Sequence, residues 1–198
     1  MVTQPSPRSM SVEEWRLLER THPDQKYEYI DGKVYMMSGG SFNHARIAQN
    51  MIAELNNTFG DGPCSAYNSD VRVRLSEERY TYPDVSVTCS EHDQGTEDEM
   101  EIPLLIAEVL SDSTEARDRG RKFSYYRACP TIQEYVMIAT RYQTVEVYRR
   151  TSAGWTSYRV YGPGDVVELE SLNIYIPIAT LYRRTTLPEG LKDVEGEV

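Results

Sequence analysis

Two carboxylates and one lysine are the residues of this chain whose types and spacing suit metal chemistry. Asp84 lies in residues 82–87, YPDVSV, Glu108 lies in residues 104–109, LLIAEV, and Lys122 follows in a basic segment. If the first two segments are neighbouring strands, their negative charges crowd together and raise a carboxyl pKa unless a cation intervenes. Mg²⁺ and Mn²⁺ prefer carboxylate and water oxygens as ligands. The three residues therefore indicate a site for a divalent cation.

Both carboxylate segments have the side-chain pattern of strands. Asp84 shares one face of its segment with Ser86 and Thr88, and the other face is apolar. The Glu108 segment is apolar on both faces before the glutamate, which predicts a central strand covered on two sides. A carboxylate buried there must be paired, hydrogen-bonded or bound to a metal to remain charged.

A helix over residues 114–128 is expected to bring the lysine to the carboxylates. Asp112 and Glu115 have the spacing of a capping box, with Ser111 or Ser113 as alternative caps, and Pro130 ends the helix. One side of this helix carries Asp118, Lys122, Tyr125 and Tyr126. A lysine so placed can hold a water or a phosphate as a point charge.

Further elements surround these three. Ser11 and Glu14 predict a capping box for a helix through Arg20, and Asp31-Gly32 predicts a hairpin over residues 27–37. A second helix is predicted from Phe42 to Phe59, closed by Gly60. Strands are expected at residues 71–75 and 132–138, and a C-terminal antiparallel extension at 144–149, 155–161, 166–169 and 174–178.

The ordered motifs of the chain resemble the Uma family of restriction-endonuclease-like proteins, which belongs to the PD-(D/E)XK nuclease superfamily. They are YEYIDG at 27–32, His44, Pro83-Asp84, Glu108-Val109-Leu110-Ser111, Lys122 and Tyr126. The resemblance covers residues 10–161. It implies an α/β fold with a restriction-endonuclease-like core of helix, three-stranded meander, helix and strand, here with an N-terminal helix and hairpin.

The resemblance also implies site residues. Asp84 and Glu108 would bind Mg²⁺ or Mn²⁺ together with the backbone carbonyl of Val109, and a lysine would assist. The superfamily pattern has a lysine where this chain has Leu110, and Lys122 matches members that supply it from the next helix. His44 is open to two interpretations of equal weight, a core histidine or a proton-transfer group beside the site.

Three more residues are candidates for the same site: Glu28, Glu54 and Tyr126. Exposure statistics favour a solvated position for both glutamates, with Glu28 expected as an exposed strand carboxylate. Asp70 is expected to be a turn residue. These assignments predict a metal-dependent endonuclease that hydrolyses phosphodiester bonds in DNA.

Three alternatives stay open. Glu108 could form a structural ion pair with Arg117 or Lys122. The chain could be a catalytically weak or inactive nuclease-fold protein that acts as a binding or assembly module, since fold does not fix function. It could also hydrolyse a small phosphorylated molecule.

Composition sets outer bounds on these hypotheses. The 198 residues carry a net charge of −10, the wrong sign for an avid non-specific nucleic-acid binder. Acidic residues crowd 91–101 and basic residues crowd 117–127, so a local basic strip is expected. The three cysteines are expected to be reduced, mostly buried thiols. No membrane span or signal peptide is apparent, which favours a cytoplasmic protein.

The chain is expected to divide into a flexible leader (1–9), a single domain (10–184) and a flexible acidic tail (185–198). Restriction enzymes often pair to cut two strands, so the resemblance suggests a homodimer.

Overall fold

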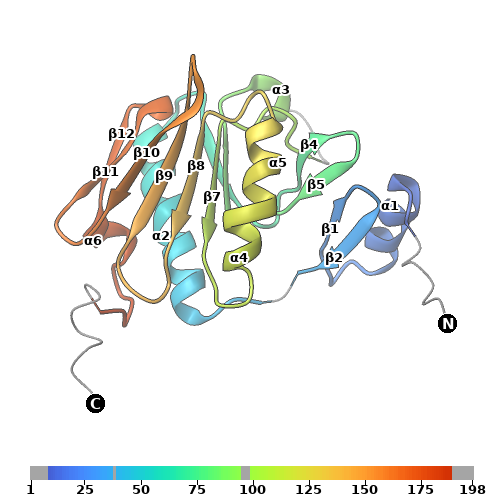
Figure 1. The fold of residues 1–198 in the computed structure, drawn as a ribbon, viewed down its shortest axis with the longest axis horizontal. Coiled ribbons are helices and arrows are strands. Elements are labelled where there is room, and N and C mark those ends of the chain that lie inside the picture. The colour runs from blue at the N-terminus through green and yellow to red at the C-terminus, as the bar shows by residue number, and fades with distance from the viewer. Residues whose placement is uncertain (1–8, 38, 95–98, 189–198) are drawn as a thin grey trace.

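The computed structural model describes residues 9–37, 39–94 and 99–188 (Figure 1). The helices are α1 (Val12–Thr21), α2 (Phe42–Phe59), α3 (Glu91–Gln94), α4 (Glu115–Arg117), α5 (Phe123–Ala128) and α6 (Ile178–Leu181). The strands are β1 (Tyr27–Ile30), β2 (Lys33–Met36), β3 (Ser65–Asn68), β4 (Val73–Ser76), β5 (Arg79–Thr81), β6 (Val85–Thr88), β7 (Leu105–Val109), β8 (Glu134–Ile138), β9 (Val145–Thr151), β10 (Gly154–Tyr161), β11 (Val166–Leu169) and β12 (Ile174–Pro177). A π-helical turn, Asp118–Lys122, joins α4 to α5, and a 3-10 turn, Glu170–Leu172, joins β11 to β12.

A six-stranded sheet in the order β10-β9-β8-β7-β6-β3 forms the centre of the molecule. Strands β7 and β8 are parallel, and every other neighbouring pair is antiparallel. Read along the chain, α2, the meander β3-β6-β7, the helix from α4 to α5, and β8 follow the predicted order of helix, three strands, helix and strand. The predicted restriction-endonuclease-like core is therefore confirmed. Of the predicted C-terminal extension, β9 and β10 continue this sheet, whereas β11 and β12 pair only with each other.

A second, four-stranded sheet in the order β2-β1-β5-β4 contains the N-terminal hairpin. The hairpin turns at Asp31 and Gly32, whose φ angles of 48° and 80° fit the two-residue turn that Asp-Gly favours. The strand predicted at residues 71–75 also belongs here, as β4, and not to the core meander. The first strand of the meander is β3, whose short and polar sequence SAYN gave no strand signal.

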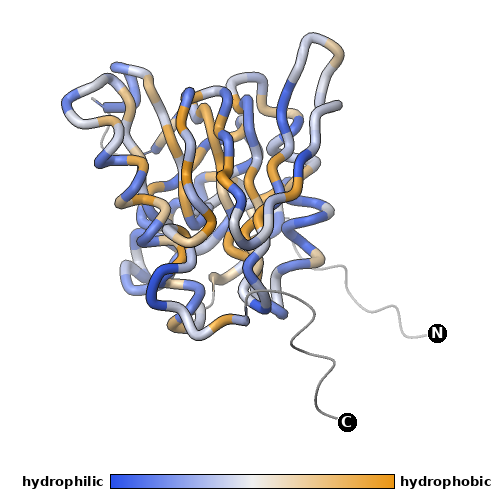
Figure 2. The backbone as a smooth tube through the Cα atoms, turned by 90° about the vertical axis from the view of Figure 1, so that its left-hand side faces the viewer, coloured by the Kyte–Doolittle hydropathy of each residue, from blue (hydrophilic) through white to orange (hydrophobic). Residues whose placement is uncertain are grey.

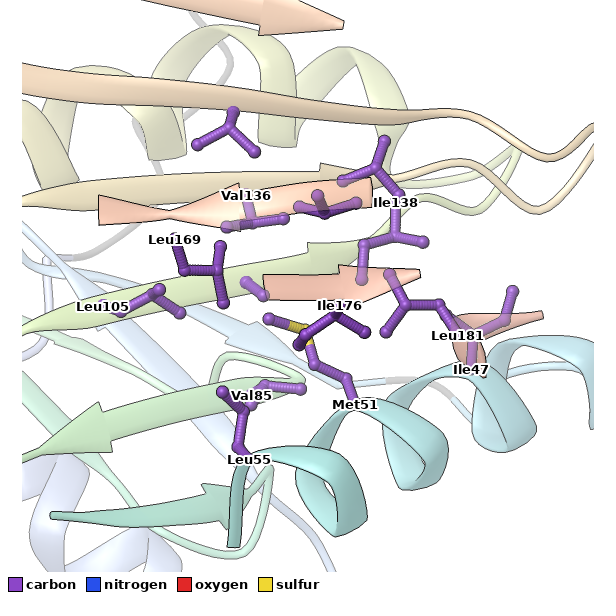
Figure 3. Close-up of a cluster of buried hydrophobic side chains, with 14 of the residues drawn as sticks. Ile47, Met51, Leu55, Val85, Leu105, Val136, Ile138, Leu169, Ile176 and Leu181 are labelled. Carbon is purple, nitrogen blue, oxygen red and sulfur yellow. The ribbon is translucent and has the colours of Figure 1, made fainter. Parts of the chain in front are cut away.

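Both faces of the central sheet are covered, as the apolar sequence of β7 predicts. Leu105, Ala107 and Val109 face one hydrophobic cluster, which α2, β11, β12 and α6 complete (Figure 3). Ile106 and Leu110 face the opposite cluster, beneath α5. Figure 2 shows the hydrophobic residues concentrated along the strands at the centre of the molecule. The core thus packs against both faces of β7, up to the C-terminal end of the strand, where Glu108 lies.

A disulfide joins Cys64 to Cys89, so the prediction of reduced thiols is wrong for these two residues. They flank β3 and β6, which pair with Ser65 opposite Thr88, so the fold brings together two cysteines that are 25 residues apart. Local spacing carried no sign of that pairing. Cys129 is a free, buried thiol, as expected.

Ser11 and Glu14 form the predicted capping box on α1. Most of the predicted leader and tail lies outside the described residues. Within the described part of the tail, Leu187 packs on the core and Pro188 accepts a hydrogen bond from the Gln143 amide at 3.3 Å. Among the described helices, none is both long and apolar enough to cross a bilayer.

Candidate active site

The two predicted metal-binding carboxylates lie side by side. Strand β6 pairs antiparallel to β7 with Val85 opposite Ala107, so Asp84, just before β6, adjoins Glu108. The Val109 amide donates a hydrogen bond to Asp84 Oδ2 at 2.8 Å. Glu108 is 4% exposed, which agrees with the buried position predicted from its strand. The fold therefore brings together the two acids that the sequence singled out.

Lys122 projects into the same place from the helix above the sheet. Its Nζ lies 2.6 Å from Glu108 Oε1 and 3.8 Å from Asp118 Oδ1, and the side chain is almost fully buried. Lys122 and Asp118 are the two ends of the π-helical turn, and both face inward. Such turns are rare, and they occur frequently at functional sites. The ion pair between Glu108 and Lys122, one of the alternatives above, is thus present.

Glu28 is the main correction among the predicted site residues. It was expected to be exposed, but it is 1% exposed and lies 3.0 Å from Lys122 Nζ through Oε1. Its other oxygen pairs with Arg117, and the Tyr82 amide donates to Oε1 at 3.3 Å. Glu28 comes from β1, in the second sheet, so its burial depends on a contact between segments far apart in the sequence. Strand alternation within the hairpin could not reveal this contact.

His44 stands at the opening of α2 and reaches the site. Its Nε2 lies 3.2 Å from Asp84 Oδ2. Burial alone would lower the pKa of His44, but the hydrogen bond and charge of Asp84 raise it above the usual value. A Cβ atom on Gly40 would come within 2.6 Å of His44 Nδ1. The absence of a side chain at Gly40 therefore leaves room for the imidazole beside Asp84. The site-neighbour interpretation of His44 is the one that the geometry supports.

Of the remaining candidates, Tyr126 contacts a site residue, whereas Glu54 and Asp70 lie outside the pocket. The Tyr126 hydroxyl donates to Glu108 Oε1 at 2.6 Å, and its ring is fully buried. Glu54 is half-buried and does not line the pocket of about 100 Å³ that Asp84, Glu108 and Lys122 share. Asp70 is exposed and its amide bonds to Asn68 Oδ1 at 3.0 Å, in the turn predicted for it. Asp118, which also lines the pocket, was predicted only as a helix-face residue.

Carboxyl groups outnumber the cations of this pocket. Four line it, Glu28, Asp84, Glu108 and Asp118, together with the cations of Lys122 and Arg117. Burial, joined by the neighbouring acids, raises the pKa of Glu108 to about 8 although Lys122 acts in the opposite direction. Burial also raises the pKa of Asp118. The pocket is therefore short of positive charge.

Lys122 stays charged, and with Arg117 it holds Glu28 ionised. Burial alone would lower the pKa of Lys122, but Glu108 and Glu28 raise it well above its usual value. Burial alone would raise the pKa of Glu28, but Lys122 and Arg117 bring it below its usual value. The carboxylate of Glu28 thus stabilises the ammonium group of Lys122 in a buried position.

The donor set fits a hard divalent cation. Asp84 and Glu108 each use one oxygen in the hydrogen bonds above, Oδ2 and Oε1, and each has a second carboxylate oxygen. Carboxylate oxygens with water are the ligands that Mg²⁺ prefers. Among the described residues, no three Asp, Glu, His or Cys side chains are gathered in a metal-binding arrangement. The predicted set of two carboxylates and one backbone carbonyl would need water to complete it.

One expectation about the helix after β7 is wrong, and a second holds only in part. Asp112 does not cap it: Thr114 stands at the cap position, and Asp112 pairs with exposed Arg141. Three members of the predicted basic strip are buried or paired, whereas Arg121 and Arg127 stay exposed. Lys122 is buried, Arg117 pairs with Glu28, and Arg119 pairs with Glu115 and Glu146. Acidic residues of other elements have thus taken up most of the local positive charge.

Comparison with solved structures gives the class of fold. A crystal structure of "a putative nuclease belonging to DUF820" from Anabaena variabilis matches with a TM-score of 0.73 at 21% identity. The match covers 87% of this chain and 97% of the other. At that identity the likeness establishes the fold, which is restriction-endonuclease-like.

Comparison of sequences gives the family. The sequence profile of Uma2, described as "Putative restriction endonuclease", matches residues 12–179. Two proteins of Synechocystis sp. (strain PCC 6803), both described as uncharacterized, are similar as well. One, slr1290, is 36% identical over 160 residues, 80% of this chain and 84% of its own length. The other, sll1609, is 34% identical over 154 residues, which are 76% of this chain and 87% of its own length. The chain belongs to the Uma2 family.

Proposed function

We propose that this protein is a Mg²⁺- or Mn²⁺-dependent endonuclease that hydrolyses phosphodiester bonds in DNA. The single observation that carries the proposal is the meeting of Asp84 and Glu108 from adjacent strands, with Lys122 Nζ 2.6 Å from Glu108. Two acids and an ammonium group from three separate segments suit the binding of a cation and a phosphate together.

Each residue would have a distinct role. Asp84 and Glu108, with the Val109 carbonyl, would hold the cation, which when bound neutralises phosphate charge and makes water more acidic. The ammonium group of Lys122 would stabilise charge that develops on the phosphate, because it is buried and already oriented by Glu28. His44, beside Asp84, would take or give a proton. Tyr126 would orient Glu108 through its hydroxyl hydrogen bond.

Nicking of supercoiled plasmid DNA tests this proposal. We expect Mg²⁺- or Mn²⁺-dependent nicking by the wild type, and a fall to background for Asp84→Ala, Glu108→Ala and Lys122→Ala. Asp112→Ala is the matched control, because Asp112 is an exposed acid of the same region that pairs only with Arg141 among the described residues. Equal nicking by all five proteins would show that the activity comes from elsewhere.

A second function has one observation in its favour. Lys122 lies between Glu28 and Glu108 and pairs with both without a metal ion, which would suit a nuclease fold used only for binding or assembly. Calorimetry with Mn²⁺ separates the two functions. Binding that disappears in Asp84→Ala supports the enzyme, whereas no metal binding supports the module. A cytoplasmic location and a homodimer stay predictions.

A further inference from the structure

A cluster of three arginines lies outside the active site. Arg46 on α2 and Arg183 and Arg184 after α6 line a hollow of about 400 Å³ together with Asn50. All three arginine side chains are exposed. Across residues 9–37, 39–94 and 99–188, none of them forms an ion pair with an acidic side chain. Many other described basic side chains, such as Arg72, Arg74 and Arg149, do pair with acids in this chain of net charge −10.

The backbone that carries two of these arginines is held firmly. Asn50, on α2, is 8% exposed, and its Nδ2 donates to Leu181 O at 2.8 Å and to Arg183 O at 2.9 Å. Arg184 has a φ of 62°, a left-handed conformation that is uncommon for residues other than glycine. A buried amide therefore fixes like charges next to one another, although their repulsion opposes it. Such backbone strain persists only where the surroundings impose it, and it often accompanies function.

The arginine cluster lies across α2 from the active site. His44, which contacts Asp84, and Arg46 are two residues apart, so their side chains leave the helix roughly 200° apart. In Figure 1, the first turns of α2 lie at the same end of the molecule as the loop between β7 and α4, and α6 packs beside α2. An α-helix with its side chains is roughly 10–12 Å across. About three nucleotides along one strand of a DNA duplex cover the same distance.

We infer that Arg46, Arg183 and Arg184 bind backbone phosphates of the DNA, on the far side of α2 from the bond that is cut. The identity of this ligand rests on the proposed function. The site accounts for how an acidic protein holds a polyanion: guanidinium groups contact phosphates by paired hydrogen bonds, and three of them are collected at one place. Contacts of this kind position DNA and carry no sequence information.

The test is the salt dependence of DNA binding, measured by fluorescence anisotropy with a short labelled duplex in EDTA, so that no cleavage occurs. The triple variant Arg46→Gln, Arg183→Gln, Arg184→Gln removes three charges and keeps polar side chains. Each phosphate contact contributes about 0.9 to the slope of log K against log salt. We expect the slope to fall by roughly two to three for the triple variant. The control is Arg159→Gln, an exposed arginine on β10, which should change neither slope nor affinity.

The outcomes separate this inference from the proposed function. An unchanged slope in a triple variant whose melting temperature matches the wild type overturns the inference, whatever the nicking assay shows. A reduced slope in a protein that nicks plasmid supports both. A reduced slope in a protein that never nicks supports the phosphate site and overturns the proposed nuclease activity. Nicking by a wild type that shows no salt-dependent DNA binding overturns the phosphate site alone.

Discussion

Lys122 has the most constrained surroundings of the residues at the site. Its ammonium group is buried between Glu28 and Glu108, which come from two different sheets. A buried charge of this kind is stable only while its partners remain, and the partners depend on it in turn. Stability and pH dependence are therefore two ways to examine the site without assuming any activity.

Replacing the lysine should destabilise the fold strongly. Lys122→Met keeps the buried stem and removes the charge, which leaves Glu28 and Glu108 short of a cation. We expect a loss of about 3–5 kcal/mol in the free energy of unfolding, as for other broken buried pairs. Urea denaturation measures it. Arg141→Met, which breaks the exposed pair with Asp112, is the control and should have no measurable effect. A loss no larger than the control's would mean that Lys122 is not in a buried ion pair.

Glu108 should give the stability a pH dependence. The pKa of Glu108 is about 8 in the folded protein and 4.5 in an unperturbed glutamate. Between these values the folded state holds the extra proton, so stability falls as pH rises, by about 1.4 kcal/mol per pH unit from this group. Glu108→Gln removes this contribution. Urea titrations of both metal-free proteins should therefore show a flatter curve for the variant, and parallel curves would contradict the raised pKa.

At the scale of elements, the segment between β2 and α2 sets the position of His44. Gly40 approaches the imidazole, whereas a Cβ atom on Gly39 would meet no atom within 4 Å. Gly40→Ala should displace His44 from Asp84 and reduce nicking nearly as much as His44→Ala, roughly 100-fold if His44 transfers a proton. Gly39→Ala should keep wild-type activity in the same assay. Equal effects of the two alanine substitutions would mean that His44 has no role in this mechanism.

The disulfide between β3 and β6 should support the sheet without touching the site. Cys64 pairs with Cys89 at the end where Ser65 lies opposite Thr88, whereas Asp84 adjoins the other end of β6. Reduction should cost about 2–4 kcal/mol, because it frees a closed loop in the unfolded chain. The melting temperature with and without reductant measures this cost. Nicking should persist in the reduced protein when it is assayed well below that melting temperature. An unchanged melting temperature would mean that the bridge does not form in solution.

At the scale of the whole molecule, the sequence predicted best what is encoded locally. The capping box at Ser11, the hairpin turn at Asp31-Gly32 and the helix Phe42–Phe59 all follow from neighbouring residues, and the structure has each of them. The pairing of Asp84 with Glu108 was also predictable, since both lie at strand ends with strong strand patterns.

What escaped prediction depends on contacts between distant segments. Glu28 is buried because the second sheet folds against the helix that carries Arg117 and Lys122. Cys64 and Cys89 meet because β3 and β6 pair, and β3 itself lacked a strand signal. The basic strip is reduced for the same reason, because Glu28 and Glu146 pair with two of its arginines from other strands. Local patterns specify elements, while their partners follow from the assembled core.

A crystal structure grown with Mn²⁺ and measured for anomalous scattering would show whether Asp84 and Glu108 bind a metal ion together. We expect one peak bonded to an oxygen of Asp84 and an oxygen of Glu108, with the amine of Lys122 directed at the same pocket. A site without manganese, in which Lys122 still bridges Glu28 and Glu108, would contradict this expectation.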